Sequence, residues 1–364
     1  ILRAMLRAAV VLSLVACAGK NPVSPEAGPS DAAHDAGPPA HVVAYISGYG
    51  PDLAWFDLDP ATGALAPVGS VAAFASNPSF LAMTQTHLYA ASEGGSRVGA
   101  YAIDQATGAL TFINDVASSG NGPAHVSVSG GFVLVANYDA GSVAVLPTRS
   151  DGGVMPASQT LAAGGNAHQI VADPTGAFVL VPCKGADYVA QYTFAAGTLT
   201  PNATPRATTA AGAGPRHLAL AGDHAYLVNE LDSTLTVFTF AAGRLAPIQT
   251  VSTRAPGATG TNTGAEVAIS GRFVYTSNRG DDDLAVFEIG ATGTVTLVGN
   301  TPTGGNTPRI FAIDPSGRWL FAGNQNSSTV TTFSIDTTTG MPTPTGASLD
   351  ITSPAFIGFV ALPR

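Results

Sequence analysis

The segment TPRIFAIDPSGRWLFAGNQNSSTVTTF, residues 307–333, contains three short apolar runs separated by residues that favour turns. The first run opens at a proline, the second ends in Gly-Asn, and the third closes on a phenylalanine. Short runs of β-branched and aromatic residues bounded by Gly, Asn, Asp and Pro are typical of antiparallel strands. This segment therefore predicts three successive strands of one small sheet.

The same arrangement recurs seven times along the chain. In each copy an aromatic residue or leucine stands three positions before the end of the second strand, and a large apolar residue closes the next strand. In five copies a glycine-containing turn, such as DPATGAL at 59–65, then leads to a final strand. The second strands are predicted to end at Gly48, Ser92, Asn137, Cys183, Asn229, Asn278 and Asn324.

Repeats of roughly 43 to 50 residues with four short strands each are typical of β-propeller blades. The first copy, from about His41, lacks the short opening strand, whereas an extra one stands near Pro354 at the end of the sequence. We therefore predict an all-β, seven-bladed β-propeller over residues 41–364. The C-terminal strand would join the first blade, which closes the ring and covers an otherwise open sheet edge.

Charge excludes some partners. Charged residues make up 11% of the chain, and the net charge is −9 with only 15 Lys plus Arg. A nucleic-acid partner is not expected, because phosphate binding needs a basic face. No amphipathic helical pattern follows residue 40. We expect no cofactor, and we expect a monomer.

The first residues, ILRAMLRAAVVLSLVACAGK, combine two arginines, a short apolar run and small residues before a cysteine. This pattern predicts an export signal that is too short to span a bilayer. The run ending at Cys17 resembles a bacterial lipobox, so residues 1–17 are predicted to be a lipoprotein signal with Cys17 lipidated. The alternative is an ordinary signal peptide. Residues 18–40 are predicted to be a flexible tether.

This prediction makes the protein an exported lipoprotein, anchored to a bacterial membrane only through its lipid. The sequence starts with Ile1, and Met5 could be the true initiator. The only other cysteine, Cys183, would stay unpaired, so no disulfide framework is expected.

Charged residues recur where the blades should meet one mouth of the ring. In an antiparallel blade, the start of the first strand and the end of the second lie on the same face. Arg216, His217 and Glu230, in GPRHLALAGDHAYLVNE (214–230), should therefore share that mouth. Equivalent positions in other blades hold His125, His168, Glu266, Arg309, Glu93, Tyr138, Lys184, Arg279 and Gln325.

Structural roles for the same residues stay open. The recurring asparagines at the strand ends are most simply turn residues that bond local backbone. Arg216, Glu230 and Arg279 could form rim salt bridges, and the histidines could be satisfied polar groups in the channel wall. Calcium held by Asn and Glu oxygens also stays open, although no metal site is predicted.

The residue types present favour one kind of chemistry. A carboxylate or imidazole in a partly dry mouth can deprotonate water, and guanidinium groups can bind an acid or stabilise an oxyanion. Together they suit water attack on a lactone of an acidic sugar. The sequence has neither a GxSxG nucleophile motif nor HExxH zinc spacing.

Segments such as GPRHLALAGDHAYLVNELDSTLTVF (214–238) and AEVAISGRFVYTSNRGDDDLAVFEI (265–289) resemble the bacterial lactonase family of seven-bladed propellers. That family includes 6-phosphogluconolactonases and fungal carboxymuconate cyclases. The resemblance runs from about Tyr45 to the C-terminus and implies a channel site in which a His, two Arg and a Glu act. By motif these are His168, Arg216, Glu230 and Arg279.

The resemblance implies hydrolysis of a small lactone or related sugar-acid substrate. Glu230 or His168 would act as general base, while Arg216 and Arg279 bind the acidic group and the oxyanion. The substrate-binding residues are predicted to be His125, His217, Glu266 and Arg309.

Two segments depart from the family pattern, ISGYGPDLAWF (46–56) and PCKGAD (182–187), and both should lie at the mouth. Export also conflicts with 6-phosphogluconolactone, which belongs to cytoplasmic metabolism. A second function therefore stays open, a non-catalytic cell-surface propeller that binds a glycan, peptide or protein.

Overall fold

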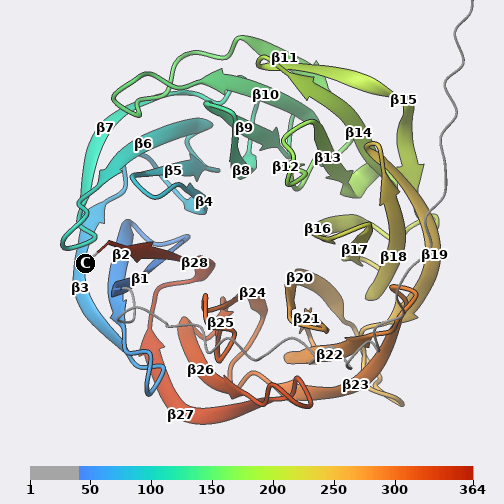
Figure 1. The fold of residues 1–364 in the computed structure, drawn as a ribbon. Coiled ribbons are helices and arrows are strands. Elements are labelled where there is room, and N and C mark those ends of the chain that lie inside the picture. The colour runs from blue at the N-terminus through green and yellow to red at the C-terminus, as the bar shows by residue number, and fades with distance from the viewer. Residues whose placement is uncertain (1–40, 364) are drawn as a thin grey trace, which may run out of the picture. The chain divides into compact units, whose positions relative to one another are not determined.

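The computed structural model describes residues 41–363, which form seven four-stranded antiparallel sheets around a central axis (Figure 1). This arrangement confirms the predicted all-β, seven-bladed propeller. The sole helical element in the described range is a single 3-10 turn at Lys184–Ala186. The predicted signal, the lipidated Cys17 and the 18–40 tether lie outside the described residues and stay predictions.

Each blade runs from an inner strand at the axis to an outer strand at the periphery. Blade 1 comprises β28 (Pro354–Leu362), β1 (His41–Gly48), β2 (Asp52–Leu58) and β3 (Leu65–Ala72), and blade 2 comprises β4 (Pro78–Met83), β5 (His87–Ser92), β6 (Arg97–Ile103) and β7 (Leu110–Ala117). Blade 3 comprises β8 (Pro123–Ser129), β9 (Phe132–Asn137), β10 (Ser142–Pro147) and β11 (Gln159–Ala162). Blade 4 comprises β12 (Val171–Ala172), β13 (Phe178–Cys183), β14 (Tyr188–Ala195) and β15 (Thr198–Thr208).

Blades 5 to 7 follow in the same order. Blade 5 comprises β16 (Pro215–Ala221), β17 (His224–Asn229), β18 (Thr234–Ala241) and β19 (Arg244–Ser252). Blade 6 comprises β20 (Thr263–Ser270), β21 (Phe273–Arg279), β22 (Asp283–Ile289) and β23 (Val295–Pro302). Blade 7 comprises β24 (Pro308–Ile313), β25 (Trp319–Asn324), β26 (Thr329–Ile335) and β27 (Pro342–Asp350).

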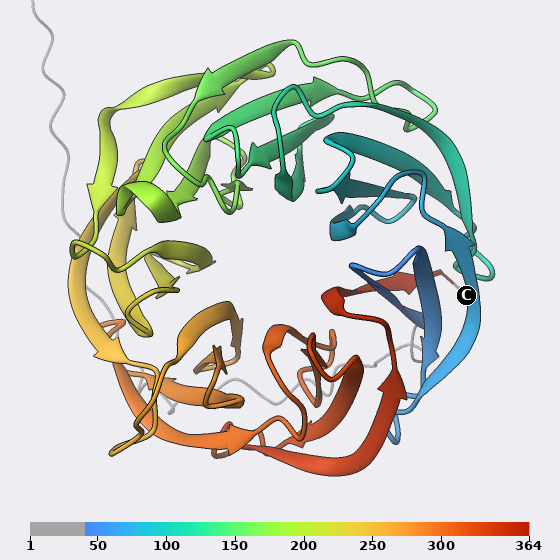
Figure 2. The same cartoon turned by 180° about the vertical axis from the view of Figure 1, so that it is seen from behind.

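The ring is closed by strands from opposite ends of the described chain. β28 pairs antiparallel with β1, with Ile46 opposite Ile357, and so supplies the inner strand of blade 1. Figure 2 shows the same closure from behind, where the last strand lies beside the first. The predicted closing strand is therefore confirmed.

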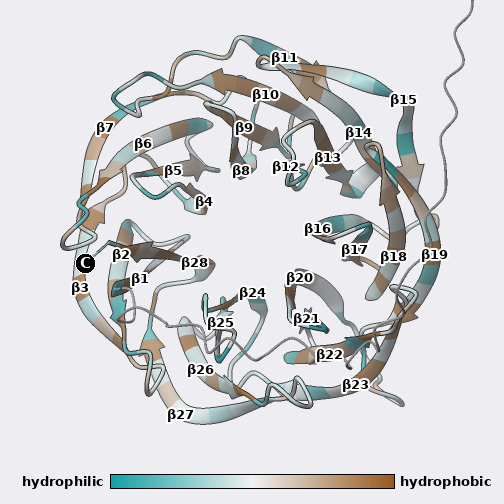
Figure 3. Ribbon diagram, viewed as in Figure 1, coloured by the Kyte–Doolittle hydropathy of each residue, from teal (hydrophilic) through white to brown (hydrophobic). Residues whose placement is uncertain are grey.

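The core lies between neighbouring blades, because both faces of each middle strand are covered. β9 and β13 are buried along nearly their whole length, whereas outer strand β27 is mostly exposed. Figure 3 shows the matching colours, with hydrophobic residues concentrated on the middle strands and a paler β27.

The recurring tyrosine and the recurring glycine turn of the sequence bind each other across blades. The Tyr226 hydroxyl donates to Gly293 O at 3.0 Å, and the Tyr275 hydroxyl donates to Gly340 O at 2.9 Å. Tyr45 makes the same bond to Gly108 O at 2.7 Å. These glycines have φ between 72° and 78°, a region that favours glycine. The repeated tyrosine and the repeated glycine turn therefore form a hydrogen bond that joins adjacent blades.

Irregular pairing at the axis positions several site residues. The pairing of β16 with β17 shifts register between Pro215 and His217, so Arg216 faces no partner residue. The same shift between Pro308 and Ile310 leaves Arg309 unpaired. Such bulges redirect a side chain out of the regular alternation.

One inner strand differs from the prediction. The segment NAHQIVAD was expected to form a full strand, but only Val171–Ala172 does so. The start of the segment still contacts β13, because Ala167 is bridged to Cys183 and His168 N donates to Pro182 O at 2.9 Å. Between these residues and Val171 the pairing is interrupted, and the Gln169 side chain bonds the backbone of blade 5, where its Oε1 accepts from Leu218 N at 2.8 Å.

Candidate active site

A cavity of about 170 Å³ lies at the predicted mouth of the ring. Every blade contributes to it, which places it on the ring axis. Six of its residues directly follow the predicted ends of the second strands. The lining residues are Tyr49, Glu93, Ala124, Tyr138, His168, Lys184, Glu230, Arg279 and Arg309.

Glu230 is held by three cations from three blades. Its carboxylate oxygens lie 2.7 Å from Lys184 Nζ, 3.1 Å from Arg216 Nε and 3.1 Å from Arg279 Nη2. Burial alone would raise the pKa of Glu230, but Arg216, Arg279 and Lys184 lower it to about 2. Glu230 is therefore an anion at neutral pH and a weak base.

Arg216 lies behind the lining residues. Its side chain is almost fully buried, and its Nη1 donates to Ala265 O. Burial, reinforced by Arg279 and Arg309 and opposed by Glu230, lowers the pKa of Arg216 to about 9. The guanidinium is still charged at neutral pH and adds positive potential beneath the cavity.

A hydrogen-bonded chain leads away from the cavity through two histidines. His168 lines the cavity, and its Nδ1 lies 3.1 Å from Nε2 of His217. The Nδ1 of His217 lies 2.9 Å from Oε2 of Glu266. Burial lowers the pKa of His168 well below its usual value, helped by the charge of Arg216. His168 is therefore a neutral imidazole at neutral pH.

His125 has a different environment from His168. Its ring lies against Phe80, with ring centroids 4.1 Å apart, and its centroid is 5.7 Å from that of His217. Burial lowers the pKa of His125 well below its usual value, and His217 and Arg216 reinforce this. His125 thus forms part of a neutral aromatic wall behind the cavity.

The opposite side of the cavity carries a cation with no carboxylate partner among the described residues. The Arg309 guanidinium lies over the Tyr49 ring, 5.3 Å from its centroid, and the Tyr49 hydroxyl donates to Glu93 at 2.7 Å. Three cationic and two acidic side chains line the cavity in all. This balance favours an anionic ligand.

The structure brings the predicted catalytic residues together. His168, Glu230 and Arg279 line the cavity, and Arg216 contacts Glu230. Arg309, predicted to bind substrate, also lines the cavity. The predicted substrate-binding residues His125, His217 and Glu266 lie outside the lining set. Their assignment as ligand contacts stays a prediction.

Sequence reasoning left five lining residues out of the proposed site, one of them Ala124 on β8. Tyr49, Glu93, Tyr138 and Lys184 each stand one position after a predicted strand end. By that shared position the sequence placed Glu93, Tyr138 and Lys184 at the mouth without giving them a role, and the same position could have identified Tyr49.

Other candidate chemistry finds little support in residues 41–363. No cluster of three or more His, Cys, Asp or Glu there has an arrangement suited to a metal ion. Burial raises the pKa of the Cys183 thiol to about 12, which makes it unreactive. No helix of this range is long and apolar enough to cross a membrane.

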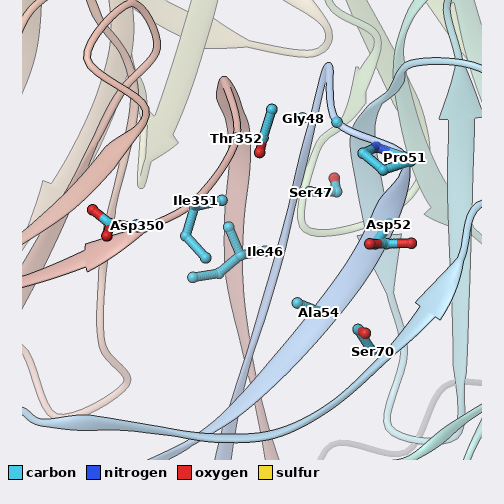
Figure 4. A pocket seen from close by; sticks show the side chains of 11 residues that line it. Ile46, Ser47, Gly48, Pro51, Asp52, Ala54, Ser70, Asp350, Ile351 and Thr352 are labelled. Carbon is cyan, nitrogen blue, oxygen red and sulfur yellow. The ribbon is translucent and has the colours of Figure 1, made fainter.

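A second hollow lies between blades 7 and 1, next to the closing strand (Figure 4). It measures about 240 Å³, and Asp52 and Asp350 are its only charged residues. Figure 4 shows Ile46 and Ile351 side by side between these two carboxylates. The hollow lacks the cationic lining of the axial cavity.

Fold and site together define a seven-bladed propeller with an axial, cationic, histidine-containing cavity. The comparisons narrow this class: the chain belongs to the lactonase family of seven-bladed β-propellers, whose family model matches residues 40–359. This membership confirms the resemblance that the motifs suggested.

Named relatives agree with the family. The chain is 35% identical over 217 residues to a 6-phosphogluconolactonase of Serratia proteamaculans and 36% identical to one of Pectobacterium carotovorum. Each match covers 57% of this chain and 65% of the relative, which is just under two thirds of its length.

Solved structures are similar over a longer range. The periplasmic gluconolactonase of Pseudomonas aeruginosa is 31% identical with a TM-score of 0.82, covering 88% of this chain and 100% of that one. A putative 6-phosphogluconolactonase of Bacteroides fragilis is 28% identical with a TM-score of 0.82, covering 88% and 98%.

Proposed function

We propose that the protein hydrolyses the ring ester of a small acidic lactone. The observation that carries this proposal is a neutral imidazole, His168, on a cavity that also holds Arg279 and Arg309. A neutral imidazole can accept a proton from water, and guanidinium groups can hold an acid or an oxyanion. The names of the relatives support the same reaction class.

In the proposed reaction, His168 Nε2 takes a proton from water while the water oxygen bonds to the lactone carbonyl carbon. The carbonyl electron pair moves onto oxygen, where Arg279 stabilises the charge. Collapse of this intermediate breaks the bond to the ring oxygen, which takes the proton back from His168. Lactone and water thus give one hydroxy acid.

Glu230 has a supporting role in this scheme. With a pKa of about 2 and three cations on its oxygens it is a poor base, so we assign the base to His168, whose Nε2 has no hydrogen-bond partner among the described residues. Glu230 instead compensates the cations around it and holds Arg279 in place at 3.1 Å. Arg309, which has no carboxylate partner among residues 41–363, is free to bind the acidic group of the substrate.

The substrate proposed is a lactone of a sugar acid, with or without a phosphate. One relative is named for a phosphorylated substrate and another for gluconolactone in the periplasm. Export as a lipoprotein is part of the proposal and favours the unphosphorylated compound. Fatty-acid labelling of the protein and of Cys17→Ala would test the anchor.

The test measures hydrolysis of a panel of neutral, carboxylated and phosphorylated lactones by pH-stat. We expect His168→Gln to lower kcat by about 100-fold or more with little change in KM. Arg309→Gln should raise KM for acidic lactones about tenfold, yet leave KM for neutral ones within about twofold. Arg244→Gln, on the exposed start of β19, is the matched control and should behave as wild type.

Two outcomes would overturn the proposal. One is wild-type turnover by His168→Gln. The other is a lack of hydrolysis by the wild-type protein together with saturable binding of a glycan or peptide at the cavity, which would favour the non-catalytic alternative.

A further inference from the structure

We propose that His217 and Glu266 are positioning residues that fix His168 in the tautomer whose Nε2 accepts a proton from water in the cavity. This inference rests on the proposed function, in which His168 is the base. It gives the two residues a role different from the substrate contact predicted from the sequence.

The three side chains come from three adjacent blades. His168 precedes β12 in blade 4, His217 lies on β16 in blade 5, and Glu266 lies on β20 in blade 6. The side chain of His217 is 2% exposed and that of Glu266 is 11% exposed, so water competes little for their hydrogen bonds. The separations of 3.1 Å and 2.9 Å are those of direct hydrogen bonds.

The direction of each hydrogen bond follows from the carboxylate. Oε1 of Glu266 accepts from Val267 N at 3.0 Å, and Oε2 faces Nδ1 of His217. A carboxylate accepts and does not donate, so Nδ1 of His217 carries the proton and its Nε2 is a bare acceptor. Nδ1 of His168 must then donate to it, which leaves Nε2 of His168 with a lone pair.

Of the three hydrogen-bonded side chains, only His168, which carries this lone pair, lines the cavity. Nε2 of His168 has no hydrogen-bond partner among the described residues. It is also absent from the set of fully buried unpaired atoms, so it is accessible from the cavity that His168 lines. The opposite tautomer would present an N–H donor to water and could not act as a base. The hydrogen-bonded series from Glu266 through His217 to His168, here called the relay, therefore selects the reactive tautomer of His168.

The surrounding charges make this selection important. Arg216, Arg309 and Lys184 all oppose a positive charge on His168. Arg216 and Arg309 also oppose one on His217, whereas Glu266 favours it, and His125 is the remaining titratable group beside His217. When His168 takes a proton, the hydrogen bonds to His217 and Glu266 stabilise the imidazolium, as an aspartate does in a Ser-His-Asp triad.

Glu266→Gln tests the inference with almost no change in shape. Val267 N–H orients the new amide, because only the amide oxygen can accept from it. The amide NH₂ then faces Nδ1 of His217 and forces that nitrogen to accept, which reverses the whole chain. Nε2 of His168 would become a donor.

The primary readout is ¹⁵N NMR of histidine-labelled protein, which needs no substrate. In the wild type we expect protons on Nδ1 of both His168 and His217. In Glu266→Gln both should move to Nε2. Unchanged tautomers in the variant, or an Nε2 proton on wild-type His168, would overturn the inference, and the wild-type measurement stands even if the variant fails to fold.

Kinetics supply the second readout. Glu266→Gln should lower kcat by about 100-fold or more while KM changes less than about threefold, because the guanidinium groups stay in place. Glu288→Gln is the isosteric control. The Glu288 side chain is exposed and pairs with Arg272 in the same blade, so this variant should match the wild type in tautomers and turnover.

The two readouts separate the inference from the proposed function. Reversed tautomers in a protein that hydrolyses no lactone would refute the reaction and leave the relay standing. Undiminished kcat in a variant with reversed tautomers would show that the relay exists but does not position the base, which overturns the inference.

Discussion

Glu230 shows how neighbours decide the role of a single side chain. A carboxylate at the mouth of a propeller is a natural candidate for a general base, and the sequence supported that interpretation. Lys184, Arg216 and Arg279 surround it, however, and hold its pKa at about 2. Its main contribution is therefore to offset positive charge that would otherwise stand unbalanced beside the buried Arg216.

This role predicts an acid-dependent contribution to stability. The folded pKa of Glu230 is depressed from 4.5 to about 2, so its contribution is fully present above pH 4.5 and is lost as the pH falls toward 2. The shift corresponds to about 3 kcal/mol. We expect Glu230→Gln to be about 3 kcal/mol less stable at pH 7 and to lose less stability than the wild type between pH 4.5 and 2.

Urea unfolding at pH 7, 4.5 and 2.5 measures this difference. Glu288→Gln, whose carboxylate is half exposed, is the control and should unfold like the wild type. Parallel pH profiles for Glu230→Gln and the wild type would contradict the predicted role.

The sequence predicted the site residues in part. The position after each second strand could be located from the repeat alone, and it holds six of the lining residues. Tyr49 was missed because it stands between Gly48 and Gly50, in a segment that departs from the family pattern. The burial of His217 and Glu266 depends on how bulged inner strands direct side chains, which residue spacing does not specify.

At the scale of the elements, the recurring asparagines stabilise the strand ends by bonds across the blade. Asn278 donates to Thr253 O and to Asp283 at 2.8 Å each, and its Oδ1 accepts from Thr253 Oγ1 at 2.7 Å. Asn324 donates at 3.2 Å to Thr331, and its Oδ1 has no partner in the described structure. Equivalent positions therefore differ in how well their polar groups are satisfied.

We expect Asn278→Ala to cost about 3 kcal/mol and Asn324→Ala about 1 kcal/mol, since only the first leaves several buried partners unsatisfied. Both side chains are fully buried and both changes remove the same atoms, so the difference isolates the hydrogen bonds. Chemical denaturation of the two variants gives the comparison. Equal costs would show that the asparagines act only as space-filling turn residues.

Strand positions were predicted well wherever the backbone ladder dominates. Six of the seven predicted ends of the second strands coincide with observed ends, and β21 extends one residue further, to Arg279. The continuous strand predicted at β12 is interrupted between Ala167, which is bridged to Cys183, and Val171, where the Gln169 side chain bonds a neighbouring blade. Sequence periodicity carries no information about such a contact between blades.

At the scale of the whole molecule, ring closure depends on β28. Its pairing with β1 runs from His41 to Gly48, and it buries Phe356, Ile357 and Leu362. A chain ending at Asp350 would leave the edge of β1 open to other chains. We expect this truncation to form soluble aggregates and to lose cooperative unfolding.

Size-exclusion chromatography with light scattering checks this expectation. A chain ending at Leu362 is the matched control and should elute like the full-length protein. A synthetic peptide of residues 351–364 should reduce the aggregates by restoring the missing strand. A truncated chain with the full-length mass and melting temperature would show that closure is dispensable.

Every blade presents a residue to the axial cavity, and these residues are not the ones that join neighbouring blades through tyrosine–glycine bonds. The tyrosine hydroxyls and glycine carbonyls of these bonds lie outside the cavity lining, whereas six of the seven blades place a cavity residue directly after the predicted end of the second strand. Gene duplication followed by drift at those few codons could diversify the chemistry of such a protein without rebuilding its architecture. A combinatorial library restricted to them would vary the cavity and leave the bonds between blades unchanged.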